Sequence, residues 1–185
     1  MLCPNATSDE LNYIQNGLTI SEFKPRHFYL QANTIQKEIG FVVSGLLRTF
    51  HVDNKGNEIT VNFIGENRYA TDYSAFITQT PCKYYIQCIE PCIIVNISYQ
   101  HIHEGYVRFP HLEKYGRLIA ERILQIQQKR IESFLFDNAE TRYLKFITEN
   151  PNLINRVSLT YLSSYLGIKR QSLTRIRKKL HHDSF

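Results

Sequence analysis

The side chains best suited to chemistry lie near the end of the chain, in a stretch rich in cations, amides and hydroxyls. Arginine can pair with guanine edges, glutamine can pair with adenine, and hydroxyls bind phosphates. A helix with such groups at its first turns has the chemistry to contact DNA bases and backbone. In a helix expected over 169–181, the candidate DNA-contacting residues are Lys169, Arg170, Gln171, Ser172, Thr174, Arg175 and Lys178.

The elements that would position this helix form a helix-turn-helix pattern. Ser158 can cap a first helix, and Leu162 and Leu166 lie four residues apart on one of its faces. Gly167 follows at once, and glycine adopts the left-handed conformation that a tight turn between two helices needs. The pattern alone leaves a solvated basic helical hairpin open as the alternative. The predicted buried stripe of the second helix consists of Leu173, Ile176 and Leu180.

The charge distribution favours nucleic acid as a partner. Residues 156–185 carry seven Lys and Arg and one Asp, an excess of six positive charges, whereas the whole chain carries an excess of five. The rest of the chain is therefore close to neutral. A neutral body with one basic end is typical of a nucleic-acid contact surface, because phosphates supply most non-specific affinity.

Length and composition indicate one or two globular domains. The chain has 185 residues, of which 43% are hydrophobic. No apolar run approaches the ~20 residues that span a bilayer. The first residues lack the basic start and apolar core of a secretory signal. We therefore expect a cytoplasmic protein with no membrane partner.

The four cysteines show no metal-binding spacing. No C-x-x-C pair occurs, so a zinc ribbon is not expected. The prediction is that those in the strand region are small apolar fillers in a reducing compartment. An iron–sulfur or redox sensor is the alternative, but we expect no iron–sulfur cofactor. The four are Cys3, Cys82, Cys88 and Cys92.

Strand signals dominate from about residue 20 to residue 98. Segments 40–52 and 58–65 are rich in β-branched and aromatic residues, and the turn cluster 53–57 separates them. Many short strands separated by Gly, Pro and Asn turns predict an antiparallel barrel or sandwich.

Two further local predictions concern the ends of this region. A hairpin is expected over 83–98, with its bend at residues 90–91. Before the strands, Ser8 is expected to cap a short helix that turns Leu11 and Ile14 inward.

Helical periodicity resumes after the strands, over 111–136. A helix of about 25 residues is roughly twice the usual globular length, and such a helix commonly pairs with a copy of itself. We favour a homodimer over a helix packed only on its own sheet, since helix-turn-helix proteins read two half-sites. The predicted dimer interface consists of Leu112, Tyr115, Ile119, Arg122, Ile123 and Ile126.

Another amphipathic helix is predicted over 138–150, ended by Pro151. Its inward residues should be Tyr143, Leu144 and Ile147.

The order of these elements, and the residues in several segments, resemble the Crp/Fnr family of bacterial transcription regulators, in the form common in Bacteroidota. The resemblance implies an α+β fold: an N-terminal antiparallel β-roll of the cyclic-nucleotide-binding type, a long dimerisation helix, and a winged-helix-type helix-turn-helix with a short or absent wing. It divides the chain into a sensor domain at 1–110, the dimerisation helix at 111–136 and a DNA-binding domain at 137–185. The most similar segments are Phe41–Arg48, Gly56–Asn67, Gly116–Glu121, Arg130–Phe136 and Glu140–Leu180.

The resemblance implies a homodimeric regulator that reads a palindromic operator in double-stranded DNA, with RNA polymerase as a candidate partner. In the family an Arg-Glu-x-x-x-Arg set reads bases, and this chain has Arg170, Gln171 and Arg175 at those places. Gln in place of Glu predicts a different operator, because a carboxylate accepts from cytosine whereas Gln pairs with adenine. The alternative is a ligand-sensing interaction module without sequence-specific DNA binding. No enzyme is expected, since no nucleophile–base set, phosphate loop or carboxylate pair stands out.

The ligand-binding end departs from the family pattern. Cyclic nucleotide binders carry a Gly-Glu pair, present at Gly65-Glu66, and then an Arg-Ser or Arg-Thr, for which this chain has Cys82-Lys83. A phosphate needs a positive fork or an array of N–H donors, so we expect that cAMP does not bind. A small effector other than cAMP and a roll filled by its own aromatic side chains remain open. The candidate effector pocket consists of Gly65, Glu66, Arg68, Tyr73 and Lys83.

The family also contains haem sensors. An isolated histidine on a sheet or loop is usually a solvated or hydrogen-bonded side chain, so we expect neither haem nor a metal site here. The histidines that raise the question are His51, His101 and His103.

Overall fold

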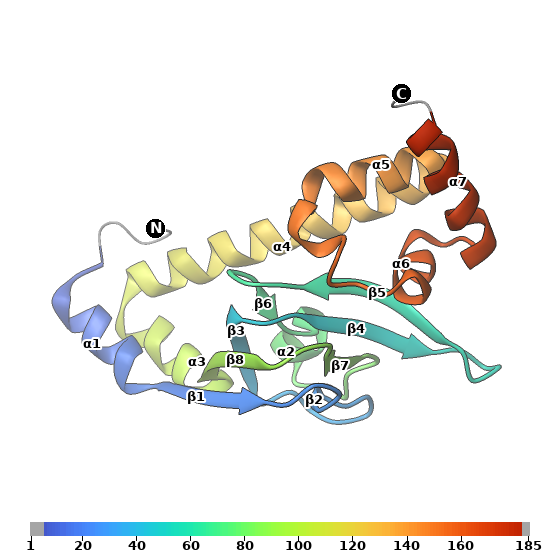
Figure 1. The fold of residues 1–185 in the computed structure, drawn as a ribbon. Coiled ribbons are helices and arrows are strands. Elements are labelled where there is room, and N and C mark those ends of the chain that lie inside the picture. Colours follow the sequence, from blue (N-terminus) through green and yellow to red (C-terminus); the bar gives the residue numbers. More distant parts are fainter. Residues whose placement is uncertain (1–5, 183–185) are drawn as a thin grey trace. The chain divides into compact units, whose positions relative to one another are not determined.

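Two four-stranded antiparallel sheets form the β-roll in the computed structural model, which describes residues 6–182 (Figure 1). Cys3 lies outside the described residues. The first sheet runs in the order β1 (Leu18–Phe23), β8 (Cys92–Ser98), β3 (Glu38–Ser44) and β6 (Tyr69–Ala70). The second runs in the order β2 (Phe28–Leu30), β7 (Tyr85–Cys88), β4 (Leu47–Val52) and β5 (Glu58–Ile64).

Apolar side chains from both sheets meet in one core. Strand side chains alternate between faces, so each sheet turns one set of residues inward. The fully buried members include Val42 and Ile94 of the first sheet and Leu47 and Ile86 of the second. The predicted turn at 53–57 is confirmed, because Asp53 N donates to Asn57 O at 2.9 Å.

The hairpin predicted over 83–98 is wrong, although the bend at residues 90–91 is present. β7 and β8 belong to different sheets, so the chain crosses between the sheets at this bend. β8 is paired on one side by β1 and on the other by β3. It therefore has no free edge for β7.

The first helix, α1 (Ser8–Asn16), is present, but its predicted cap and inward face need correction. Thr7 is the cap, and it forms a capping box with Glu10. Glu10 is buried, whereas Leu11 is 54% exposed, because the capping box turns Glu10 toward the protein. Ile14 is half-buried, in partial agreement with the expectation.

The long helix is confirmed as α4 (Pro110–Phe136), with 27 residues. Two shorter helices were not predicted, α2 (Tyr73–Thr78) and α3 (Tyr99–Arg108). Ser98 caps α3 by accepting from His101 N at 3.1 Å. Among the described helices, none combines the length and apolar character needed to span a membrane.

The chain divides into two compact units. Residues 1–49 and 63–128 form unit 1, and residues 50–62 and 129–185 form unit 2. Unit 2 thus contains the tip of the β4–β5 hairpin together with the C-terminal helices. The functional boundaries at residues 110 and 136 stay a prediction.

Unit 2 contains α5 (Ala139–Glu149), the 3-10 turn η1 (Pro151–Leu153), α6 (Leu159–Leu166) and α7 (Arg170–His182). In α5, Tyr143 is buried and Ile147 half-buried, but Leu144 is 40% exposed, which corrects its predicted inward position. Phe146 is buried instead, and its ring packs 5.5 Å from that of Tyr165. The predicted α+β class, a β-roll followed by a long helix and a C-terminal helix-turn-helix, is confirmed.

Candidate nucleic-acid interface

The turn between α6 and α7 has the geometry that the sequence predicts. Ser158 caps α6 by accepting from Tyr161 N at 3.2 Å. Gly167 has φ 67° and ψ 35°, the left-handed conformation. A Cβ added there would lie 2.8 Å from Cε1 of Phe134, so glycine is required for packing as well as for the turn.

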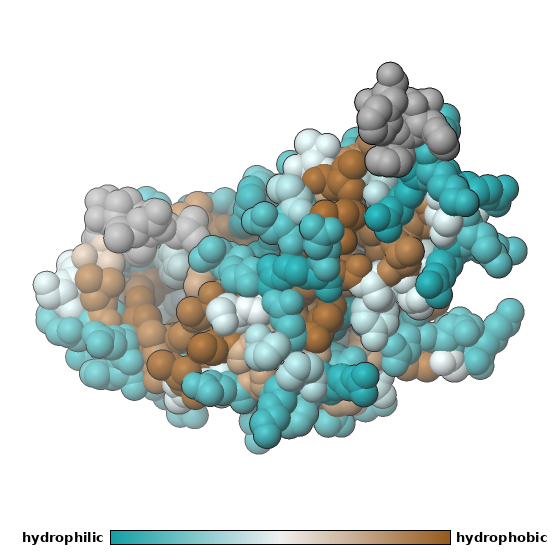
Figure 2. All heavy atoms as spheres, viewed as in Figure 1, coloured by the Kyte–Doolittle hydropathy of each residue, from teal (hydrophilic) through white to brown (hydrophobic). Residues whose placement is uncertain are grey.

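α7 presents its polar side to the surroundings and its apolar side to unit 2. Leu173 is fully buried, and Ile176 and Leu180 are half-buried. Figure 2 shows hydrophilic side chains gathered over α7. Of the predicted DNA-contacting residues only Ser172 is half-buried. The exposed ones are Lys169, Arg170, Gln171, Thr174, Arg175 and Lys178.

The cations at the predicted DNA-contacting positions form no ion pair within the described part of the chain. Within residues 6–182, the side chains of Lys169, Arg170, Arg175 and Lys178 have no ion-pair or hydrogen-bond partner. Thr174 differs, because its hydroxyl donates to Arg170 O at 3.1 Å. The Thr174 hydroxyl therefore has only its acceptor lone pairs left for contacts outside the helix, beside the methyl group.

Lys179 of α7 differs from these cations, because it forms an ion pair within unit 2. Lys179 Nζ lies 3.0 Å from both carboxylate oxygens of Glu140 in α5, so its charge is neutralised within unit 2. A shallow hollow of about 380 Å³ lies along the same side of α7, lined by Ser172, Arg175, Ile176 and Lys179.

Two arginines, Arg130 and Arg142, hold the C-terminal end of α6, and neither was among the predicted site residues. The Arg130 guanidinium lies 3.7 Å from the centre of the Tyr165 ring and donates to Tyr165 O. Arg142 Nε donates to Leu166 O at 3.0 Å. The carbonyls at a helix C-terminus carry partial negative charge, which cations stabilise. Burial lowers the pKa of the Arg130 guanidinium. In the sequence, these two residues could be noticed only as arginines within amphipathic helices.

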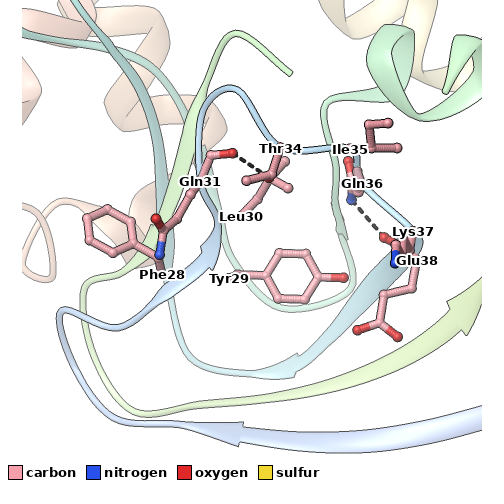
Figure 3. A pocket seen from close by; sticks show the side chains of 9 residues that line it. All are labelled: Phe28, Tyr29, Leu30, Gln31, Thr34, Ile35, Gln36, Lys37 and Glu38. Atoms are coloured by element: carbon pink, nitrogen blue, oxygen red, sulfur yellow. Dashed lines mark hydrogen bonds between the residues drawn. The ribbon is translucent and has the colours of Figure 1, made fainter. Parts of the chain in front are cut away.

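The predicted effector residues lie in three different segments of unit 1. Glu66 Oε1 accepts from Gly45 N at 3.0 Å, in the turn between β3 and β4. Tyr73 begins α2, and Arg68 and Lys83 are exposed. A hollow of about 640 Å³ in this unit is lined by residues 28–31 and 34–38 (Figure 3), none of which belongs to the predicted set.

Polar groups that precede α2 are hydrogen-bonded to the buried side chain of Gln36. Gln36 is 3% exposed. Its Nε2 donates to Glu38 O at 2.8 Å (Figure 3) and also to Ala70 O at 3.3 Å. Its Oε1 accepts from Asp72 N at 3.0 Å and from Thr71 Oγ1 at 3.2 Å. One amide thus satisfies four groups that precede α2.

Backbone and thiol donors at the start of α2 and at Cys82-Lys83 are also paired within the chain. The Asp72 carboxylate accepts from Ala75 N and from Lys83 N, both at 3.4 Å. The Cys82 thiol donates to Gln31 O at 2.9 Å. These donors are therefore paired with oxygens of the chain, one of which carries a negative charge that would repel a phosphate.

The residues of the predicted dimer interface fall into two groups. Leu112 is buried within unit 1, where it packs at Gly105, so it is removed from the proposed seam. The Tyr115 hydroxyl lies 3.1 Å from that of Tyr69, which engages it within the same unit. Tyr115 is half-buried, and the other half-buried or exposed members are Ile119, Arg122, Ile123 and Ile126.

The three described cysteines are free thiols buried in the core. The Cys88 thiol donates a hydrogen bond to Cys92, which raises the pKa of Cys88 and favours its neutral form. The burial of all three thiols agrees with the prediction that they are apolar fillers. In the described part of the chain, no group of three His, Cys, Asp or Glu could hold a metal ion.

Known proteins resemble this chain in its first domain by sequence and over its length by structure. Residues 20–108 match the family model of the cyclic nucleotide-binding domain. No curated protein sequence matches the chain. FixK2 from Bradyrhizobium japonicum has a TM-score of 0.80 at 12% identity, over 90% of this chain and 86% of that one. The c-di-GMP responsive global regulator CLP from Xanthomonas campestris has a TM-score of 0.71 at 15% identity, over 96% and 93%.

A putative transcriptional regulator of the Crp/Fnr family from Eubacterium rectale is also similar, with a TM-score of 0.76 at 15% identity, over 97% of this chain and 85% of that one. At such identities the likeness shows the fold alone. Residues 20–108 are therefore similar to the cyclic nucleotide-binding domain, and the chain as a whole has the fold of these solved structures.

Proposed function

We propose that this protein is a homodimeric transcription regulator of Crp/Fnr type that reads a palindromic operator through α7. One observation carries the proposal. Four exposed cations, Lys169 just before α7 and Arg170, Arg175 and Lys178 within it, have no partner among the described residues, and the helix-turn-helix that holds them is well capped. Such a surface suits a polyanion whose grooves admit a helix.

The base contacts follow from the chemistry of the first turns of α7. Arg170 and Arg175 offer paired donors for guanine, and Gln171 offers a donor and an acceptor for adenine. Lys169 and Ser172 are the phosphate contacts in this proposal. The unpartnered part of α4, including Ile123 and Ile126, supplies the two-fold seam that would place two copies of α7 on two half-sites.

The roll is proposed to sense a small effector other than cAMP, with RNA polymerase as a further partner of the bound regulator. The internal pairing of the groups around α2 supports the first part, since a cyclic phosphate would have to displace Gln36 and Asp72.

Selection of binding sites from random DNA duplexes tests the proposal. The full-length protein should enrich a palindrome with two half-sites about one helical turn apart. Arg170→Ala and Arg175→Ala should each lose roughly 1–3 kcal/mol of discrimination at particular base pairs while affinity for random DNA falls little. Gln171→Glu should move the preference at one position from adenine to cytosine.

Arg177→Ala is the matched control. Arg177 is an exposed cation of the same helix, about two turns beyond Arg170. Its loss should weaken specific and random binding alike. If Arg170→Ala behaves in the same way as this control, α7 does not read bases. If no duplex is enriched at all, the chain is an interaction module rather than an operator-binding regulator.

A further inference from the structure

β5 forms an open edge of the second sheet, and its exposed backbone groups can be identified. The strand order places β5 at the end of the sheet, beside β4. Asp53 N donates to Asn57 O, so Asn57 faces β4. Backbone groups of successive strand residues face opposite edges. Glu58 and Thr60 therefore direct their backbone N–H and C=O groups away from β4.

A single hydroxyl from α6 occupies this edge. Thr60 N donates to Ser164 Oγ at 2.9 Å, and Ser164 Oγ donates to Glu58 O at 3.4 Å. A serine hydroxyl can donate once and accept twice, so it replaces both backbone partners that a neighbouring strand would supply. Sheet edges are commonly covered in this way by a helix or loop. The hairpin tip and α6 lie side by side within unit 2 (Figure 1).

The Thr60–Ser164 bond has a buried donor residue, Thr60, and a half-buried acceptor residue, Ser164. Thr60 is buried, and its side-chain Oγ1 has no hydrogen-bond partner in the structure. The Thr60 N–H would therefore find little compensation from solvent if Ser164 were lost. The rest of α6 is held elsewhere, by Arg130 and Arg142 at its last carbonyls.

We propose that Ser164 is a positioning residue that fixes the β4–β5 hairpin to α6 and thereby holds α7 in the orientation that reads the operator. The proposal rests on the proposed DNA-binding function and adds a role for the hairpin. Without the hydroxyl, α6 keeps its ties to α4 and α5 but loses its tie to the sheet edge. α7 then samples more orientations, which weakens base contacts before it weakens phosphate attraction.

Two variants of equal shape separate the hydroxyl from packing. Ser164→Thr keeps the hydroxyl, and Ser164→Val replaces it with a methyl group. Thr160→Ala, on an exposed position of the same helix, is the control for a change within α6. The full-length proteins are compared by affinity for the selected operator, affinity for random DNA, thermal melting and hydrogen exchange of the Thr60 amide.

Ser164→Val should lower operator affinity by about three- to tenfold and accelerate Thr60 amide exchange by about tenfold, with random-DNA affinity unchanged. Ser164→Thr and Thr160→Ala should match the unmodified protein. Equal behaviour of the Val and Thr variants overturns the proposal, as does an equal fall in operator and random binding. An unmodified protein that selects no operator overturns the proposed function itself, and the positioning role with it. Thr60 exchange would then still report whether the edge contact exists.

Discussion

The surroundings of α2 and the exposed side of α7 differ in whether their hydrogen-bond donors are paired within the chain. Both segments place polar donors near the start of a helix. Around α2 the donors are paired with Gln36 and Asp72, which are themselves part of the chain. On α7, Arg170, Arg175 and Lys178 have no side-chain partner within the described residues, whereas Lys179 is paired with Glu140. Donors that are already satisfied stabilise the fold, and donors that are left exposed are available to another molecule.

The difference follows from where acceptors occur. The first region contains a buried amide and a carboxylate within hydrogen-bond distance of its donors. Between Arg156 and His182 the sequence contains no Asp or Glu. Glu140 reaches this segment from α5, where it neutralises Lys179. Under the proposed function, an anionic partner is therefore expected at α7 and not at α2.

The largest effect is predicted for a substitution that removes the packing of α7, Leu173→Ala. Leu173 is fully buried between α7 and the rest of unit 2. Leu173→Ala should cost roughly 2–5 kcal/mol, because it removes apolar contacts and leaves a cavity. Chemical denaturation followed by circular dichroism measures the loss, and operator binding should disappear at the same time. Leu144→Ala, at an exposed apolar position, is the control. Equal costs for the two variants would show that α7 is not anchored by Leu173.

A smaller effect is expected from the α2 side. Gln36→Ala removes the amide that pairs with four neighbouring groups. Leaving buried polar groups unpaired costs roughly 1–3 kcal/mol, and urea denaturation should show a loss in this range. Gln15, an exposed glutamine of α1, is the matched position, and Gln15→Ala should have almost no effect. A neutral Gln36→Ala would mean that water replaces the amide, in which case the region around α2 is open to ligands.

The sequence predicted the α6–α7 unit well because its determinants are local. The cap at Ser158, the glycine at 167 and the spacing of Leu162, Leu166 and Leu173 all act within about four residues of the structure they specify. Propensity, capping and periodicity describe interactions at that range. The exposed cations of α7 followed from the same helical periodicity.

The sequence did not predict the surroundings of α2 because they depend on pairs far apart in the chain. Gln36 and Asp72 are 36 residues apart, and their contact depends on the pairing of β3 with β6. The crossing at residues 90–91 likewise depends on β1 and β3 occupying both edges of β8. In α5, the choice of Phe146 over Leu144 is made by the Tyr165 ring. Periodicity cannot distinguish such neighbours.

The smallest expected effect is that of cAMP on the melting temperature, which should be close to zero, in contrast to the effect of operator DNA. A ligand present at one hundred times its Kd stabilises a protein by about 2.7 kcal/mol. The operator should raise the melting temperature of unit 2, because it binds groups that the fold leaves exposed. Millimolar cAMP should leave the melting temperature of the roll unchanged, because the donors around α2 would first have to release Gln36 and the Asp72 carboxylate. A reproducible rise with cAMP would mean that this exchange is favourable, so that internal pairing protects the site without closing it.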